Sequence, residues 1–200
     1  VILVAGVSGD VWRSAAGEGF ERVLTAAVEA PVLDREGGRF FLLGGPGALW
    51  SSPDGVAWRL AHSGAADEYL TDVAFTGGHW VAVGARVFSW QASPIQLESG
   101  DGSSWSRVEP AGGGWSSILW TGERFVSLDN WSRCSPGGCS GGYRLRASAD
   151  GRSWVEVAAS SSDQWRAAPP AAGLGRLVLV GSRGEVRTSS DGPAWTSQWS

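Results

Sequence analysis

The chain has 200 residues, of which 18% are charged, and its formal net charge is -4 at pH 7. A surface that binds nucleic acid needs clustered basic groups, so this acidic balance argues against that class of protein. The 13 Trp and 6 Phe exclude a disordered Gly-rich chain, because such chains lack large apolar groups. The longest apolar runs, 1–5 and 177–180, are far too short to span a membrane.

Short apolar runs separated by turn residues recur along the whole chain, which is typical of an all-β protein. In chain order, the clearest expected strands lie at 1–4, 40–43, 48–51, 58–60, 72–75, 80–83, 105–108, 117–120, 125–128, 143–147, 154–157, 177–180 and 185–188. No stretch keeps a helical apolar period, so we expect no helix.

A repeated motif, S-x-D-G-x-x-W, organises these strands. It occurs at 52–58, 99–105, 148–154 and 189–195, and a decayed copy at 14–20 has Ala16 for Asp and Phe20 for Trp. Asp-Gly between two strands is a strong hairpin signal, because Gly accepts a positive φ without steric cost. Equivalent positions are 38 to 49 residues apart, which is the length of a four-stranded β-propeller blade.

The motif resembles the short form of the Asp-box, or BNR repeat, which occurs in sialidases, sortilin-type receptors and many bacterial propellers. The resemblance implies an all-β fold, a β-propeller of about five four-stranded antiparallel blades, forming a single domain over 1–200. The expected repeats are 1–28, 29–66, 67–112, 113–162 and 163–200, with the innermost strand missing from the first blade. That blade is either three-stranded or has lost sequence upstream. A further alternative is that the chain is part of a larger propeller.

In the family, the Asp-box shapes a turn on the face away from the usual ligand site, so we expect a structural role for Asp54, Asp101, Asp150 and Asp191. The opposite face is formed by the blade-to-blade loops and by the loops between second and third strands, where binding residues are expected. These expected loops include 59–71, 85–94, 109–116, 129–142 and 158–168. They present His62, Asp67, Glu68, Tyr69, Trp90, Trp115, Asp129, Trp131, Arg133, Asp163, Trp165 and Arg166.

Flat aromatic side chains beside carboxylates and guanidinium groups suit a sugar-binding surface. The predicted ligand-binding residues are Trp115, Trp131, Arg133, Asp163, Trp165 and Arg166. Trp115 and Trp165 stand near the starts of inner strands, so they could instead fill gaps between blades.

The only two cysteines, Cys134 and Cys139, enclose four residues of one expected loop. A local disulfide is the simplest interpretation and would indicate an oxidising compartment, with reduced structural thiols as the alternative. No CxxC or HExxH spacing occurs, so we expect neither a metal nor a cofactor. All 16 basic residues are Arg, a bias typical of a GC-rich bacterial genome.

These observations predict a non-catalytic binding or scaffolding propeller, secreted or periplasmic, whose partner is a glycan or a protein. The alternative is a glycoside hydrolase, either sialidase-like or using two carboxylates; a third possibility is a purely structural module. The resemblance to sialidases would require an Arg-Ile-Pro segment, which the chain lacks. A two-carboxylate site could draw on Asp67, Glu68, Asp72, Asp129 and Asp163. The oligomeric state is not predicted.

Overall fold

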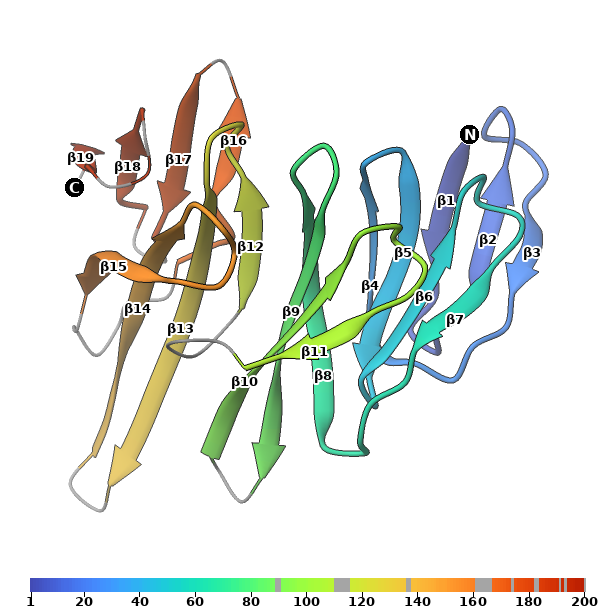
Figure 1. Cartoon of the computed structure of the whole chain (residues 1–200), viewed down its shortest axis with the longest axis horizontal. Helices are drawn as coiled ribbons and strands as arrows, with labels where there is room; N and C mark the ends of the chain where they lie inside the picture. The colour runs from blue at the N-terminus through green and yellow to red at the C-terminus, as the bar shows by residue number, and fades with distance from the viewer. Residues whose placement is uncertain are drawn as a thin grey trace. The chain divides into compact units, whose positions relative to one another are not determined.

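The computed structural model describes residues 1–88, 91–109, 116–135, 138–160, 167–173, 175–181, 184–190, 192 and 194–199. For 91, 132–135, 139 and 199 the description is limited to the backbone. All regular structure in this part of the chain is strand, in five antiparallel sheets (Figure 1).

The strands follow one another along the chain as antiparallel meanders. They are β1 (Ile2–Ala5), β2 (Val11–Ser14), β3 (Glu21–Leu24), β4 (Glu29–Glu36), β5 (Arg39–Gly45), β6 (Ala48–Ser52), β7 (Arg59–His62), β8 (Glu68–Phe75), β9 (Trp80–Phe88), β10 (Gln91–Ser99), β11 (Ser106–Val108), β12 (Ser117–Trp120), β13 (Phe125–Ser135), β14 (Gly138–Ser148), β15 (Val155–Ser160), β16 (Ala171–Gly173), β17 (Arg176–Val180), β18 (Val186–Ser189) and β19 (Thr196–Trp199). The sheets are β1–β3, β4–β7, β8–β11, β12–β15 and β16–β19.

The predicted fold class is confirmed: the chain is all-β and built of propeller blades. In the four-stranded sheets the motif turn joins the third strand to the fourth, whereas in the first sheet it joins β2 to β3. The three strands of the first sheet are therefore equivalent to the second, third and fourth strands of the other blades.

The chain divides into two compact units, Val1–Val108 and Glu109–Ser200, which are treated separately below. The first unit contains three sheets and two apolar clusters, one around Leu42 and Val11 and the other around Phe41 and Leu97. The second unit contains two sheets and one cluster around Leu128 and Leu179. The prediction of one single domain stays a prediction.

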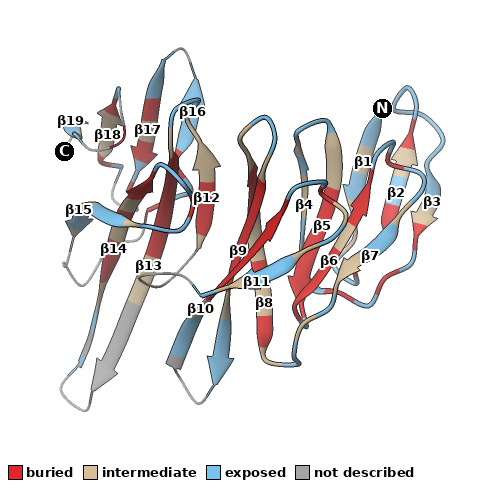
Figure 2. Cartoon of the chain, viewed as in Figure 1, coloured by how far each residue is buried: buried red, intermediate tan, exposed pale blue. Residues whose placement is uncertain are grey.

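The middle strands of the blades are buried on both faces, as the red segments of β5, β9 and β13 show in Figure 2. Successive side chains of a strand point to opposite faces. On β5, Phe41 and Leu43 therefore belong to one apolar cluster while Leu42 belongs to the other. A strand covered on both sides has a continuous apolar sequence, which is why these strands are conspicuous in the sequence.

The motif turns are closed by their own side chains. In the turn at 52–58, the Ser52 hydroxyl accepts the Gly55 N–H at 2.9 Å, and Asp54 Oδ1 accepts the N–H groups of Val56 and Ala57, both at 2.8 Å. The turns at 99–105 and 148–154 repeat this pattern of bonds. The carboxylates of these three copies are thus engaged within their turns, while Asp191 lies outside the described residues.

From the motif we expect its tryptophans, and Phe20 in the decayed copy, to be largely buried beside their own turns, but the structure buries them less. Trp58, Trp105, Trp154 and Trp195 are half-buried. In three of them, Trp58, Trp154 and Trp195, the indole N–H bonds to the glycine carbonyl of the surface turn, which holds the ring at the edge of the core. Phe20, the equivalent residue of the decayed copy, is 44% exposed and does not fill that position.

Two segments expected to be long loops are strands instead. The ladder of β9 and β10 continues to the pair Phe88 and Gln91, and the ladder of β13 and β14 continues to the pair Ser135 and Gly138. Figure 1 shows these as the long hairpins of their sheets. In the β13–β14 hairpin the sequence hides the extension because Ser, Gly and Arg replace the alternating apolar residues that identify a strand.

Candidate functional site

The two ends of each sheet differ in what they carry. The meander places the motif turns at one end and the turns between second and third strands at the other. The connections between blades reach the same end as the second-to-third turns, which we call the hairpin end of each unit. Most of the loop residues singled out in the sequence belong to this end.

In the first unit, Glu68 is a buried structural carboxylate at the hairpin end. Its Oε1 accepts a hydrogen bond from Arg107 Nη1 at 2.5 Å, and its Oε2 accepts the Ala65 N–H at 3.2 Å. Its carbonyl oxygen accepts the Gly47 N–H at 2.6 Å, which links the blade connection to the β5–β6 turn. Burial acts to raise the pKa of Glu68, but the bonds from Arg107 and Ala65 outweigh it and lower that pKa.

The neighbouring Asp67 forms an exposed ion pair with Arg86 of β9, whose Nε lies 2.7 Å from Asp67 Oδ2. This bond is the main reason that the pKa of Asp67 is lowered. The Asp67 carbonyl oxygen also accepts the Val87 N–H at 2.8 Å, which fastens the loop to the strand. Asp67, Arg86, Phe88 and Ser93 line a hollow of about 340 Å³.

Two further predicted loop residues lie in the first unit. The Tyr69 hydroxyl donates to Glu29 Oε2 at 3.3 Å, and its ring lies so close to Gly45 that an added Cβ there would be 2.5 Å from a ring atom. The pKa of His62 is lowered, mainly by burial. The structure therefore assembles His62, Asp67, Glu68 and Tyr69 around one blade connection.

In the second unit, Trp131 and Asp129 share one face of β13, since they are two positions apart. Asp129 is paired with Arg144 of β14 across the ladder, and the Arg144 guanidinium lies over the Trp131 ring, 5.5 Å from its centroid. Asp129 is buried, and that burial raises its pKa against the opposing charges of Arg146 and Arg144. We call Asp129, Trp131 and Arg144 the hairpin triad.

The opposite face of the same hairpin holds the second unit together. Asn130 Nδ2 donates to the Ala167 carbonyl at 2.9 Å, and the Ala167 N–H donates to Asn130 Oδ1 at 3.0 Å. Tyr143 is buried, with the guanidinium of Arg187 5.9 Å from its ring centroid. These groups are structural, so the alternation along β13 separates packing residues from the hairpin triad, in which Trp131 is partly exposed and Asp129 is buried.

The predicted ligand-binding residues all belong to the second unit, but the structure describes few of them. Trp131 is partly exposed, and Arg133 lies two positions further along β13 with only its backbone described. Four of the predicted residues lie outside the described part of the chain: Trp115, Asp163, Trp165 and Arg166. The alternative catalytic role of Asp163 therefore also stays a prediction. Whether these residues form one site stays a prediction.

Four residues of these sites were not predicted from the sequence: Arg86, Phe88, Ser93 and Arg144. Three of them, Arg86, Phe88 and Ser93, fall in the stretch 85–94. The two-position spacing of Arg86 and Phe88 was the available sign that both could lie on one face of a strand. Arg144 was hidden because it lies within the expected strand 143–147, where it matches the polar positions of an alternating strand pattern.

Other features of the described residues concern metal ions, membrane spans and further hollows. These residues contain no group of three or more His, Cys, Asp or Glu placed to hold a metal ion. They also contain no helix of the length and hydropathy that a membrane crossing needs.

Larger hollows of about 440 and 380 Å³ lie beside motif turns of the second unit. The first is lined by Asp150, whose carboxylate already accepts hydrogen bonds within its own turn.

Neither a family model nor a curated protein matches the chain. Solved structures do match, among them a GH32 β-fructofuranosidase of Bombyx mori, at a TM-score of 0.55 and 17% identity, covering 94% of this chain and 55% of that one. YCF48 from Cyanidioschyzon merolae matches at a TM-score of 0.54 and 17% identity, covering 84% and 56%. An exo-β-1,3-galactanase from Phanerochaete chrysosporium matches at 0.53 and 13% identity, covering 98% and 54%.

The chain thus spans little more than half the length of these structures. At such identities the likeness is one of fold, and it supports the β-propeller.

Proposed function

We propose that this protein is a non-catalytic binding propeller that acts outside the cytoplasm and recognises a glycan through the hairpin triad of its second unit. The observation that carries the proposal is the stacking of Arg144 on Trp131 beside Asp129. An indole face, a guanidinium and a carboxylate on one strand pair offer the apolar surface and the polar groups that a sugar ring needs. A protein partner with an exposed carboxylate is the second candidate, because Trp and Arg are also typical anchors of protein interfaces.

Two carboxylates at the hairpin end of the first unit, Asp67 and Glu68, support a binding role over catalysis. A hydrolase that uses two carboxylates needs one of them protonated as the general acid, which requires a raised pKa. The pKa values of Asp67 and Glu68 are both lowered, because each carboxylate bonds to an arginine. Both groups therefore serve as charged anchors rather than as proton donors.

The glycoside hydrolase alternative is favoured by one specific group. Burial raises the pKa of Asp129, and a raised pKa is the property that a general acid needs. Asp129 also lies two positions from Trp131 on the same face of β13. The names of two matched structures, a β-fructofuranosidase and an exo-β-1,3-galactanase, describe activities on sugars. We rank this alternative below the binding role because a two-carboxylate site needs a partner for Asp129, and Asp163, the predicted candidate of this unit, lies outside the described residues.

A glycan array tests the binding proposal with the whole chain and two tryptophan variants. Trp131→Ala should abolish glycan binding, because it removes both the stacking face and the support of Arg144. Trp12→Ala is the matched control, since Trp12 is also partly exposed and has the guanidinium of Arg22 5.8 Å from its ring centroid. Glycan binding that survives in Trp131→Ala would refute the site while leaving a binding role; no binding by the native chain would favour a protein partner.

A hydrolysis assay separates the two functions. The native chain should release no sugar from aryl glycosides or from plant and fungal oligosaccharides. Release that disappears in Asp129→Asn would replace the binding proposal by the hydrolase.

A further inference from the structure

The hollow of the first unit is lined by residues from one blade connection and one hairpin. Asp67 precedes β8, Arg86 and Phe88 end β9, and Ser93 belongs to β10. Its volume of about 340 Å³ is at the lower end of the range for ligand pockets, which is roughly 300–1,000 Å³. The size suits a ligand of one ring.

The ladder explains how these side chains come together. Arg86 and Phe88 are two positions apart, so they point to the same face of β9, and Ser93 is paired directly with Arg86. Phe88 is 70% exposed, although an aromatic ring of this size gains much from burial. The hollow thus combines an exposed aromatic face, a guanidinium, a carboxylate and a hydroxyl.

The polar groups of the hollow are held in place before any ligand binds. The 2.7 Å ion pair uses Arg86 Nε and Asp67 Oδ2. A guanidinium has five N–H donors and a carboxylate has two acceptor oxygens, so both groups keep bonding capacity for a ligand. The bond from the Val87 N–H to the Asp67 carbonyl fixes the loop, which reduces the entropy lost on binding.

The charges around the hollow favour a neutral ligand. The negative charge of Asp67 is balanced by Arg86. The charge of the next residue, Glu68, is balanced by Arg107 at 2.5 Å. A charged ligand would have to displace one member of a pair, whereas hydroxyl groups can bond to the paired Arg and Asp together.

We propose that this hollow is a second carbohydrate subsite, which takes one neutral hexose or pentose unit with its apolar face on Phe88 and its hydroxyls on Arg86, Asp67 and Ser93. The ligand class rests on the proposed glycan-binding function, whereas the residues are independent of the hairpin triad.

Saturation-transfer NMR with the whole chain tests this subsite. The probes are methyl β-galactoside, methyl β-glucoside, methyl α-arabinofuranoside and fructose, each added in excess, with glucuronate as the charged comparison. At least one neutral probe should bind, and Phe88→Ala should weaken it about tenfold, the equivalent of one lost ring contact. Arg86→Gln should weaken the same probe, since it removes the charged donor.

Two controls separate the subsite from the proposed function and from unfolding. Phe20→Ala removes another exposed phenylalanine of the first unit and should leave binding unchanged. Trp131→Ala should abolish array binding of whole glycans but leave the monosaccharide signal. If the monosaccharide signal is lost in Trp131→Ala and kept in Phe88→Ala, the subsite proposal is wrong while the proposed function stands. Binding of glucuronate without any neutral probe, or no binding of any probe, would also overturn the subsite proposal.

Discussion

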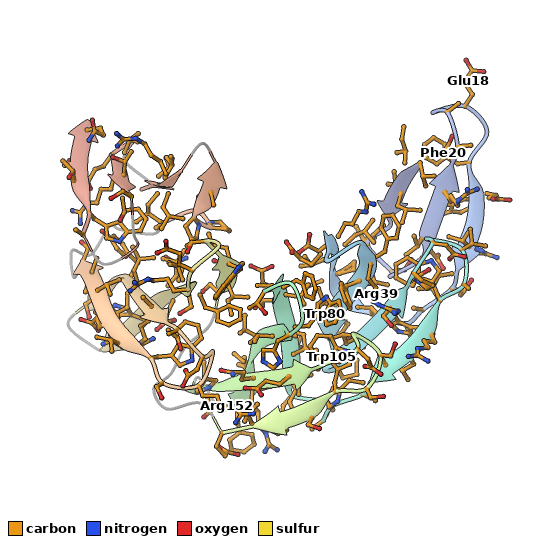
Figure 3. All side chains as sticks on the ribbon, turned by 45° about the horizontal axis from the view of Figure 1, so that its top comes forward. Glu18, Phe20, Arg39, Trp80, Trp105 and Arg152 are labelled. Atoms are coloured by element: carbon orange, nitrogen blue, oxygen red, sulfur yellow. The ribbon has the colours of Figure 1, made fainter. Side chains whose placement is uncertain are left out.

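The indole nitrogens of the motif tryptophans differ in their partners. Trp58, Trp154 and Trp195 donate from Nε1 to the glycine carbonyl of their own turn, at 3.2, 3.1 and 2.6 Å. Trp105 Nε1 is buried and has no partner among the described residues, although its ring packs edge-on to Phe41 at a centroid distance of 5.9 Å. Figure 3 labels Trp105 in the first unit. The same motif residue therefore contributes unequally to stability.

Replacing each indole by a phenyl ring should expose this difference. Trp58→Phe loses a hydrogen bond worth about 1 kcal/mol, whereas Trp105→Phe removes a buried donor whose isolation costs roughly 1–3 kcal/mol. We expect Trp105→Phe to lower the free energy of unfolding less than Trp58→Phe, by at least about 1 kcal/mol in urea titrations. An equal or larger loss at position 105 would show that its indole has a partner outside the described residues.

Glu36, at the end of β4, carries an unusual carboxyl group. Burial raises its pKa to about 7, with a further contribution from the charge of Asp34 on the same face of the strand. A folded-state pKa above the usual 4.5 means that the fold favours the protonated form. The corresponding stabilisation is complete below pH 4.5 and is lost as the pH rises to about 7.

The free energy of unfolding should therefore fall between these two pH values, and Glu36→Gln should flatten the fall because its amide stays neutral. Thermal unfolding across this range measures the effect. Glu18→Gln is the control, because Glu18 is exposed on the turn between β2 and β3 and projects from it in Figure 3. The same flattening in Glu18→Gln would contradict the assignment to Glu36.

At the level of elements, the sequence predicts the turns better than the lengths of the strands. The motif specifies its turn because the Ser and Asp side chains that it requires bond within the turn, as Ser52 does to Asp54 and Gly55. The hairpins of β9–β10 and β13–β14 are longer than predicted because cross-strand backbone bonds, which any sequence can form, sustain them beyond the core. For the same reason Phe88 and Arg86 were not predicted as site residues, although their two-position spacing was visible in the sequence.

The β13–β14 ladder gives the cysteine prediction a structural basis. Cys134 and Cys139 are directly paired across the two strands, while their side chains lie outside the described residues. Paired residues of antiparallel strands have Cα atoms about 4.5–5.5 Å apart, within the range of about 4.4–6.8 Å for disulfides. In keeping with the proposed export, we predict a disulfide, detected as a mass gain on alkylation that occurs only after reduction. Alkylation of both thiols without reduction would remove the support for an oxidising compartment.

At the scale of the whole molecule, the repeat period predicts the number of sheets, but it says nothing about how neighbouring sheets join. The joints use different chemistry in the two units. In the first unit, the Gly47 and Glu68 backbones bond to each other, while in the second the side-chain amide of Asn130 bonds to the Ala167 backbone. A side chain in one repeat can take the place of a backbone group in another. Aligning the repeats therefore does not predict which groups form the hydrogen bonds between neighbouring sheets.

Each unit also has apolar clusters of its own, from which the last prediction follows. Leu128 is fully buried in the cluster of the second unit, and Leu42 is fully buried in the first. Replacing either by Ala should cost about 2–5 kcal/mol, because it leaves a cavity. In repeat architectures such losses spread mainly to neighbouring repeats.

Leu128→Ala should therefore accelerate amide hydrogen exchange throughout β12–β19 by at least about tenfold more than in β1–β11, and Leu42→Ala should produce the reverse. Exchange measured by mass spectrometry on peptides from both units gives the comparison within one sample. Equal acceleration in both units by either variant would mean that the chain unfolds as one cooperative body, as the single-domain prediction implies.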